Sequence, residues 1–142
     1  MTTLAKESPR VFQIGDEGRM PMIVDKIFRG AAIGDNGSGL ARPLQAGDPF
    51  EGFALVDTDN SNGSAGSIRV HHKRKGRVEL PITGVSAQTD HGTAVFAVDD
   101  DTFTLSSTSN SLIGVIVEYV SGTTAVVYFD ADATKLAAAA AA

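Results

Sequence analysis

Five of the twelve Lys and Arg residues of this chain stand close together, in a run that also holds two of its three histidines. The run covers residues 71–77 (HHKRKGR), with Arg69 just before it. Such positive charge can bind a phosphate backbone, can meet an acidic patch on a partner protein, or can simply lie on a solvated hairpin. The run has no aromatic side chains on which bases could stack, which disfavours nucleic acid. We predict a surface turn whose Lys73, Arg74 and Lys75 are the candidates for contact with a protein partner.

The histidines are the residues best suited to bind zinc. Adjacent side chains on a strand point to opposite faces, so His71 and His72 cannot easily bind one ion. We therefore predict surface imidazoles for these two residues and for His91.

Two acidic segments are also candidates for binding a cation. Residues 57–63 (DTDNSNG) resemble a calcium loop, but position six is Asn62 instead of Gly and position twelve is Ile68 instead of Glu. We predict a solvated hairpin tip there, and a tight turn at the three aspartates 99–101. No nucleophile, acid–base partner or phosphate-binding glycine cluster accompanies them. The sequence therefore predicts a protein that is not an enzyme, with no catalytic residue, metal ligand or cofactor.

Composition limits the class of protein further. The 142 residues are enough for one domain, with 42% hydrophobic and 20% charged residues, as in globular proteins. The absence of cysteine excludes disulfides and thiolate sites, and the net charge of −5 disfavours a general nucleic-acid binder. No apolar run approaches the roughly 20 residues of a membrane span, and the first residues lack the features of a signal peptide. We expect a soluble protein made in a cytoplasm, with no membrane partner.

Short alternating apolar stretches, separated by many of the fifteen glycines, predict an all-β fold. Gly122 suits a hairpin turn between the last two strands, because glycine readily adopts a positive φ. The clearest predicted strands are residues 68–70, 78–80, 93–98, 102–105, 111–120 and 123–130.

A weak internal repeat appears at an offset of 62 residues. Residues 30–33 (GAAI) match 92–95 (GTAV), and residues 52–55 (GFAL) match 114–117 (GVIV). A duplicated barrel or sandwich would explain this match, and so would coincidence in a chain rich in Gly and Ala.

The two ends of the chain lack the pattern of a core. We predict an extended N-terminal arm over residues 1–20, a β domain over 21–132 and an Ala-rich tail over 133–142, helical only if something holds it. An extended arm can bind by adding a strand to a neighbouring sheet. Val11, Phe12 and Ile14 are then the expected anchors; the alternative is that they form the first strand of the domain's own sheet.

Four segments of the chain resemble the small head-decoration (cement) proteins of tailed bacteriophages. They are residues 27–34 (IFRGAAIG), 40–53 (LARPLQAGDPFEGF), 92–105 (GTAVFAVDDDTFTL) and 110–115 (NSLIGV), which together span about three quarters of the chain from Lys26 to Ala131. The resemblance lies in the order of glycines and β residues and includes no chemical signature. It implies a small barrel or β-sandwich of the β-tulip kind.

The same resemblance implies a structural virion protein on the outer surface of the capsid. Such a protein stabilises the expanded head by clamping neighbouring major capsid subunits, usually as a homotrimer, and is assembled in the host cytoplasm. Val11, Phe12, Ile14, Lys73, Arg74 and Lys75 are then the candidate capsid contacts. Residues 112–117, apolar at successive positions, favour self-association independently, because such a run has both faces covered. The alternatives are a tail or baseplate adaptor and a β-barrel module for nucleic acid.

Overall fold

A computed structural model describes residues 5–7, 10 and 14–141 of the chain. Within them, strands dominate and one helix, α1 (Ala131–Ala141), follows the last strand, which confirms the all-β prediction. The strands of the first half are β1 (Glu17–Pro21), β2 (Lys26–Ile27), β3 (Ala32–Asp35), β4 (Ala41–Pro43), β5 (Phe50–Ala54), β6 (Thr58–Asp59) and β7 (Arg69–Lys73). Those of the second half are β8 (Lys75–Thr83), β9 (Ala94–Ala97), β10 (Phe103–Thr104), β11 (Ser111–Ser121) and β12 (Thr124–Asp130), with a short 3-10 helix at Gln88–Asp90.

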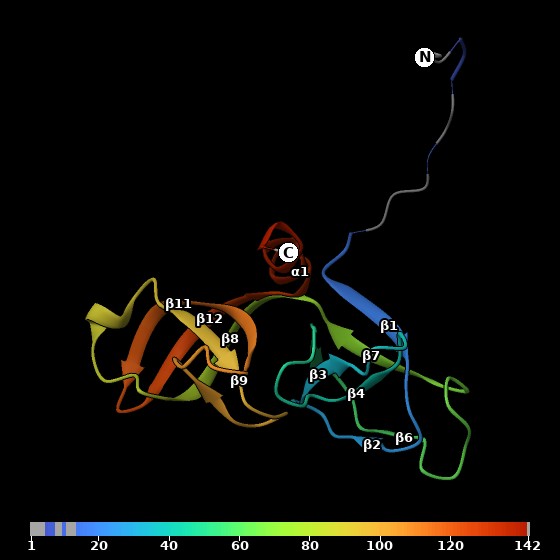
Figure 1. Cartoon of the computed structure of the whole chain (residues 1–142), viewed down its shortest axis with the longest axis horizontal. Coiled ribbons are helices and arrows are strands. Elements are labelled where there is room, and N and C mark those ends of the chain that lie inside the picture. The colour runs from blue at the N-terminus through green and yellow to red at the C-terminus, as the bar shows by residue number, and fades with distance from the viewer. Residues whose placement is uncertain (1–4, 8–9, 11–13, 142) are drawn as a thin grey trace.

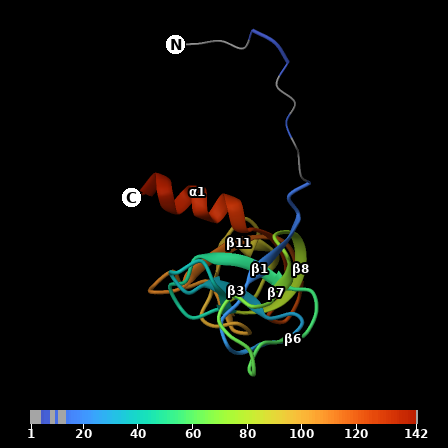
Figure 2. The ribbon, with the colours of Figure 1, turned by 90° about the vertical axis from the view of Figure 1, so that its right-hand side faces the viewer.

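The strands form two bodies that lie side by side (Figure 1). The N-terminal sheet has the order β1-β7-β5-β3-β4, and the C-terminal barrel is closed in the order β10-β8-β12-β11-β9. A small ribbon of β2 and β6 accompanies the N-terminal sheet. Helix α1 lies over the junction of the two bodies and projects to one side (Figures 1 and 2).

The two bodies share one topology and one register. In the N-terminal sheet Ile33 pairs with Gly52, and in the C-terminal barrel Val95 pairs with Gly114, 62 positions later on both strands. Both strand pairs shift register directly after this point. The register therefore supports duplication over coincidence as the origin of the repeat.

The remaining strand pairs agree with this equivalence. Pro21 lies opposite Arg69 where β1 meets β7, and Pro81 lies opposite Thr124 where β8 meets β12. An isolated parallel bridge between Met22 and Ala41 joins the edges of the N-terminal sheet, at the place where a parallel pair of β8 and β10 closes the C-terminal barrel. Each body is thus a copy of the same five-stranded unit.

A glycine marks the closest backbone approach in each copy. A Cβ on Gly52 would lie 2.0 Å from the carbonyl oxygen of Lys73, and one on Gly114 would lie 2.0 Å from that of Tyr128. Real Cβ atoms do not come so near to backbone oxygens, so both positions require glycine. These are the glycines that reveal the repeat in the sequence.

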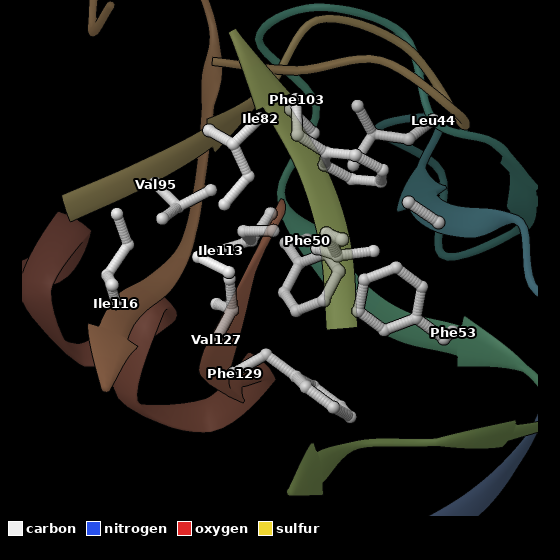
Figure 3. Packing of buried hydrophobic residues seen from close by; sticks show 14 of the residues in the cluster. Leu44, Phe50, Phe53, Ile82, Val95, Phe103, Ile113, Ile116, Val127 and Phe129 are labelled. Atoms are coloured by element: carbon white, nitrogen blue, oxygen red, sulfur yellow. The ribbon is translucent and has the colours of Figure 1, made fainter. Parts of the chain in front are cut away.

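Two hydrophobic cores hold the structure together. The smaller one fills the N-terminal sheet and contains Met22, Ile27, Ala31, Ile33, Ala41, Ala54 and Val70. The larger one fills the C-terminal barrel and continues into the junction, where Phe50 and Phe53 of β5 pack on Phe129 of β12 (Figure 3). Since residues of both copies share this larger core, we expect the two copies to fold as one unit.

The ends of the β domain differ from the predicted boundaries. Residues 17–21 form β1 and pair with β7, so the predicted arm of residues 1–20 extends at least four residues too far. A strand with Glu, Gly, Arg and Pro lacks the alternation of a buried strand, which is why the sequence does not reveal it. At the other end α1 begins at Ala131, two residues before the predicted tail.

Candidate functional site

The basic run is not a turn, which corrects the prediction from the sequence. Lys73 ends β7 and Lys75 begins β8, with only Arg74 between them, so the run crosses from one copy to the other in extended form. The turn was predicted only because charged residues are concentrated in this run. Charged residues by themselves do not make the backbone change direction. Turn chemistry such as an Asn-Gly pair is absent here.

Alternate side chains of the run point outward and are paired with carboxylates. His71 Nε2 lies 2.7 Å from Glu17 Oε1, and Lys73 Nζ lies 3.6 Å from Asp16 Oδ2. His72 points the other way and is 1% exposed. The two histidines do face opposite sides as predicted, but the surface position predicted for His72 is wrong, because this side of β7 faces the inside of the N-terminal sheet, where the ring lies against Gly18 of β1 and against Arg74.

The environment of His72 disfavours the charged form of its ring. Its burial lowers its pKa below the usual value, and the guanidinium of Arg74 lowers it further. Nε2 lies 3.4 Å from Arg74 Nη1, and Nδ1 lies 3.3 Å from the carbonyl oxygen of Val70. A guanidinium can only donate, so we assign the proton of the ring to Nδ1, which donates to Val70.

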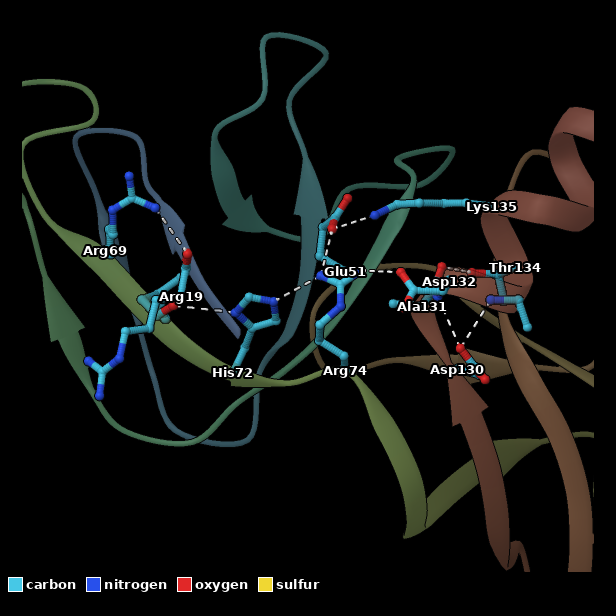
Figure 4. A network of polar contacts seen from close by, with 12 residues as sticks. Arg19, Glu51, Arg69, His72, Arg74, Asp130, Ala131, Asp132, Thr134 and Lys135 are labelled. Atoms are coloured by element: carbon cyan, nitrogen blue, oxygen red, sulfur yellow. Dashed lines mark hydrogen bonds and ion pairs between the residues drawn. The ribbon is translucent and has the colours of Figure 1, made fainter. Parts of the chain in front are cut away.

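Arg74 is the centre of an ion-pair network that joins both copies to α1 (Figure 4). Its guanidinium pairs with Asp132 of α1 and lies 3.5 Å from Glu51 Oε1 of β5. Lys135 of α1 pairs with the same oxygen of Glu51. The Glu51 side chain is 5% exposed, and a buried carboxylate of this kind needs such partners to be tolerated. The network therefore fixes the helix on the junction and compensates the buried charge.

A cavity of about 550 Å³ opens beside this network, along β1. We call it the end cavity. Its lining consists of Gly15, Glu17, Gly18, Arg19, Met20, Pro21, Asp35, Glu51, His72, Arg74 and Asp132. Arg74 was singled out from the sequence, whereas Glu51 and Asp132 were missed. The only signal for Glu51 was a charge between Phe50 and Phe53 in an apolar stretch.

The predicted arm anchors are described only in part. Val11 and Phe12 lie outside the described residues. Ile14 is described and is 88% exposed, so it packs into neither core. Other large apolar side chains on the surface are Phe28 at 63% and Leu136 at 71% exposed.

The acidic segments have structural roles. Asp99 Oδ1 accepts a hydrogen bond from the backbone N–H of Asp101 at 2.9 Å, which confirms the tight turn. The predicted solvated hairpin tip at residues 57–63 is only partly correct, because Thr58–Asp59 form β6 and pair with β2. The Asn60 side chain is buried, and its amide donates to the carbonyl oxygens of Ile23 and Ser64. Among the residues that the structure describes, no group of three or more His, Asp or Glu side chains is placed to hold a metal ion.

Comparison with protein-family models gives no match for this chain, and comparison with curated protein sequences gives none either. Within residues 5–7, 10 and 14–141, no helix has both the length and the apolar character needed to cross a bilayer.

Proposed function

We propose that this chain is a structural virion protein that binds the outer surface of a tailed-phage capsid. It stabilises the expanded head by clamping neighbouring major capsid subunits, as a homotrimer, and performs no catalytic step. The resemblance of residues 26–131 to head-decoration proteins suggests this role. The observation that supports this proposal most directly is the exposed side chain of Ile14. Ile14 directly precedes the β domain and belongs to neither of its two hydrophobic cores.

The position of Ile14 separates an anchoring segment from the folded body. The backbone N–H of Arg74 donates to the carbonyl oxygen of Asp16 at 2.7 Å, so the chain is tied to the body from Asp16 onward. The Ile14 side chain lies outside this point and packs into neither core, so it is free to contact a partner. Together with Val11 and Phe12, Ile14 forms the proposed anchor for the capsid.

Deleting residues 1–14 is expected to leave a folded domain that no longer binds heads. The core residues that the structure describes all lie beyond this segment, so the thermal transition of the truncated protein should stay within a few degrees of the original. Cosedimentation with purified undecorated heads measures the binding. Replacing Val11, Phe12 and Ile14 with serine in the full chain is the matched test of the anchors. A truncated protein without a thermal transition would place the segment in the core instead.

The basic run supports a protein partner more than nucleic acid. His71, Lys73 and Arg74 each have a carboxylate partner within the chain. Paired cations have less net charge to offer to phosphates, and phosphate contacts provide most of the affinity of general nucleic-acid binders.

Reversing the charge at Lys73 and Lys75 together is expected to weaken head binding and to make it more sensitive to salt. Both residues are exposed enough that the free energy of unfolding should change by only about 1 kcal/mol or less. Lys26→Glu is the control, because Lys26 is also exposed and lies 4.0 Å from a carboxylate oxygen of Asp59, away from the run. Equal binding of the double variant and the control would remove the run from the docking surface. Arg74 is unsuitable for this test, since its reversal would leave Glu51 buried without one of its partners.

A further inference from the structure

The two copies of the repeat carry the same apolar face, but only one of these faces is buried within the chain. Phe50 and Phe53 point away from the core of the N-terminal sheet and pack on Phe129 of the C-terminal barrel (Figure 3). The shared register places Leu112 where the first copy has Phe50 and Val115 where it has Phe53, 62 positions later in both cases. The side of β11 that carries Leu112 and Val115 is therefore the counterpart of the side of β5 that the junction buries.

The outside of the C-terminal barrel is apolar around these two residues. Leu112 lies opposite Phe96 of β9, and Val115 lies between Ala94 of β9 and Tyr128 of β12. We call these five residues the outer face. Tyr128 is 37% exposed and the other four are partly exposed, whereas the residues that alternate with them along β9 belong to the core. A sheet face that meets water is usually polar, so the outer face has the character of a contact surface.

The outer face ends where charged residues begin on β8. Arg77 lies opposite Tyr128, and Glu79 lies opposite Val126, the next outward residue of β12. Both charged side chains are on exposed positions. An apolar centre with a charged border is the usual arrangement of an interface between proteins.

Helix α1 covers the outer face only in part, because a cavity remains on either side of the helix. One cavity, of about 390 Å³, is lined by Leu112 and by Ala137 of the helix. The other, of about 200 Å³, is lined by Tyr128 and by Ala133 of the helix. The side chain of Leu136, also on α1, is 71% exposed. The helix therefore leaves room for a partner on the outer face and adds apolar surface of its own.

We propose that the outer face is the contact face for a second copy of this chain. Phe50 and Phe53 are covered by another unit of the same repeat, so a unit of the same kind is the partner that fits their counterparts Leu112 and Val115. The junction joins two different surfaces of the repeat, and contacts of this type between chains can close into a ring. The inference rests on the self-association included in the proposed function and names the face that carries it. It does not depend on binding to a capsid.

Sedimentation velocity of the full-length protein over a range of concentrations tests the proposal. We expect concentration-dependent association of the original chain, and a dissociation constant about tenfold or more higher for Val115→Arg, which places a charge at the centre of the contact. Val115 points out of the barrel, so the longer side chain has room in the free chain. Val120→Arg is the matched control: Val120 is on the same strand, is 43% exposed and lies outside the outer face, so association should not change.

A second variant decides the test if Val115→Arg has no thermal transition. Tyr128→Ser removes a side chain that is already 37% exposed, and it should also weaken association. Monomers at every concentration of the original chain, or unchanged association of the folded variants, would overturn the contact face. Dimers that these variants dissociate would support the face and contradict the homotrimer of the proposed function. Loss of head binding with unchanged self-association would concern the proposed function alone.

Discussion

Replacing Phe53 with alanine is expected to lower the free energy of unfolding by about 3–5 kcal/mol, a large part of the total for a domain of this size. The ring is 6% exposed and lies 4.9 Å from that of Phe129, 5.5 Å from Phe50 and 6.0 Å from Phe103, measured between centroids. Its removal leaves a cavity at the point where the two copies meet. Urea denaturation measures the change, and the melting temperature should fall by roughly 10 °C or more.

The same experiment reports on how the two copies fold. We expect one cooperative transition before and after the substitution, because Phe53 belongs to a core that contains residues of both copies. Phe28→Ala is the control: Phe28 is 63% exposed, so its truncation should change stability by less than about 0.5 kcal/mol. Two separate transitions, or a loss below about 1 kcal/mol for Phe53→Ala, would mean that the copies are independent domains.

Heads that lack this protein are expected to release their DNA at a lower temperature than decorated heads. If the protein clamps neighbouring subunits, it binds the assembled lattice and not the free subunit, and each site then stabilises the lattice by RT ln(1 + [L]/Kd). At a concentration of 100 Kd this amounts to about 2.7 kcal/mol per site, and many sites act together. A heating scan with a dye that fluoresces on released DNA measures the difference.

Addition of purified protein to undecorated heads should restore the release temperature. The variant without residues 1–14 is the matched control and should restore nothing. We expect the same order of stability under chelator and under osmotic shock. Undecorated heads that are as stable as decorated ones would refute the clamping role. The protein would then be a capsid surface protein that does not stabilise the head.

The strands of the second half could be predicted from the sequence. Stretches such as residues 111–120 and 123–130 carry enough apolar and β-branched residues in succession to define a strand, and the structure has β11 and β12 there. The repeat was also visible, because Gly52 and Gly114 each admit a backbone oxygen so closely that only glycine fits. Local patterns and required glycines are recorded in the sequence itself.

The strands β1 to β6 are all missing from the clearest strands predicted from the sequence. The polar residues and the proline of β1 are compatible with an arm, and only pairing with β7, some fifty residues away in the chain, makes it a strand. Strand formation of this kind depends on a distant partner, which a local pattern cannot reveal.

The candidate site was decided by the tertiary structure. Because neighbouring residues of a strand point to opposite faces, the sequence predicted that His71 and His72 face opposite sides, and the structure confirms this. Which of those sides is buried depends on how β7 pairs with β1 and β5, and the ion pairs depend on where α1 brings Asp132 and Lys135 to Arg74 and Glu51. Burial and charge pairing arise from contacts between segments far apart in the chain. For this reason the all-β class, the repeat and the absence of disulfides could be predicted from the sequence. Only the tertiary structure showed that His72 and Arg74 of the basic run line a cavity.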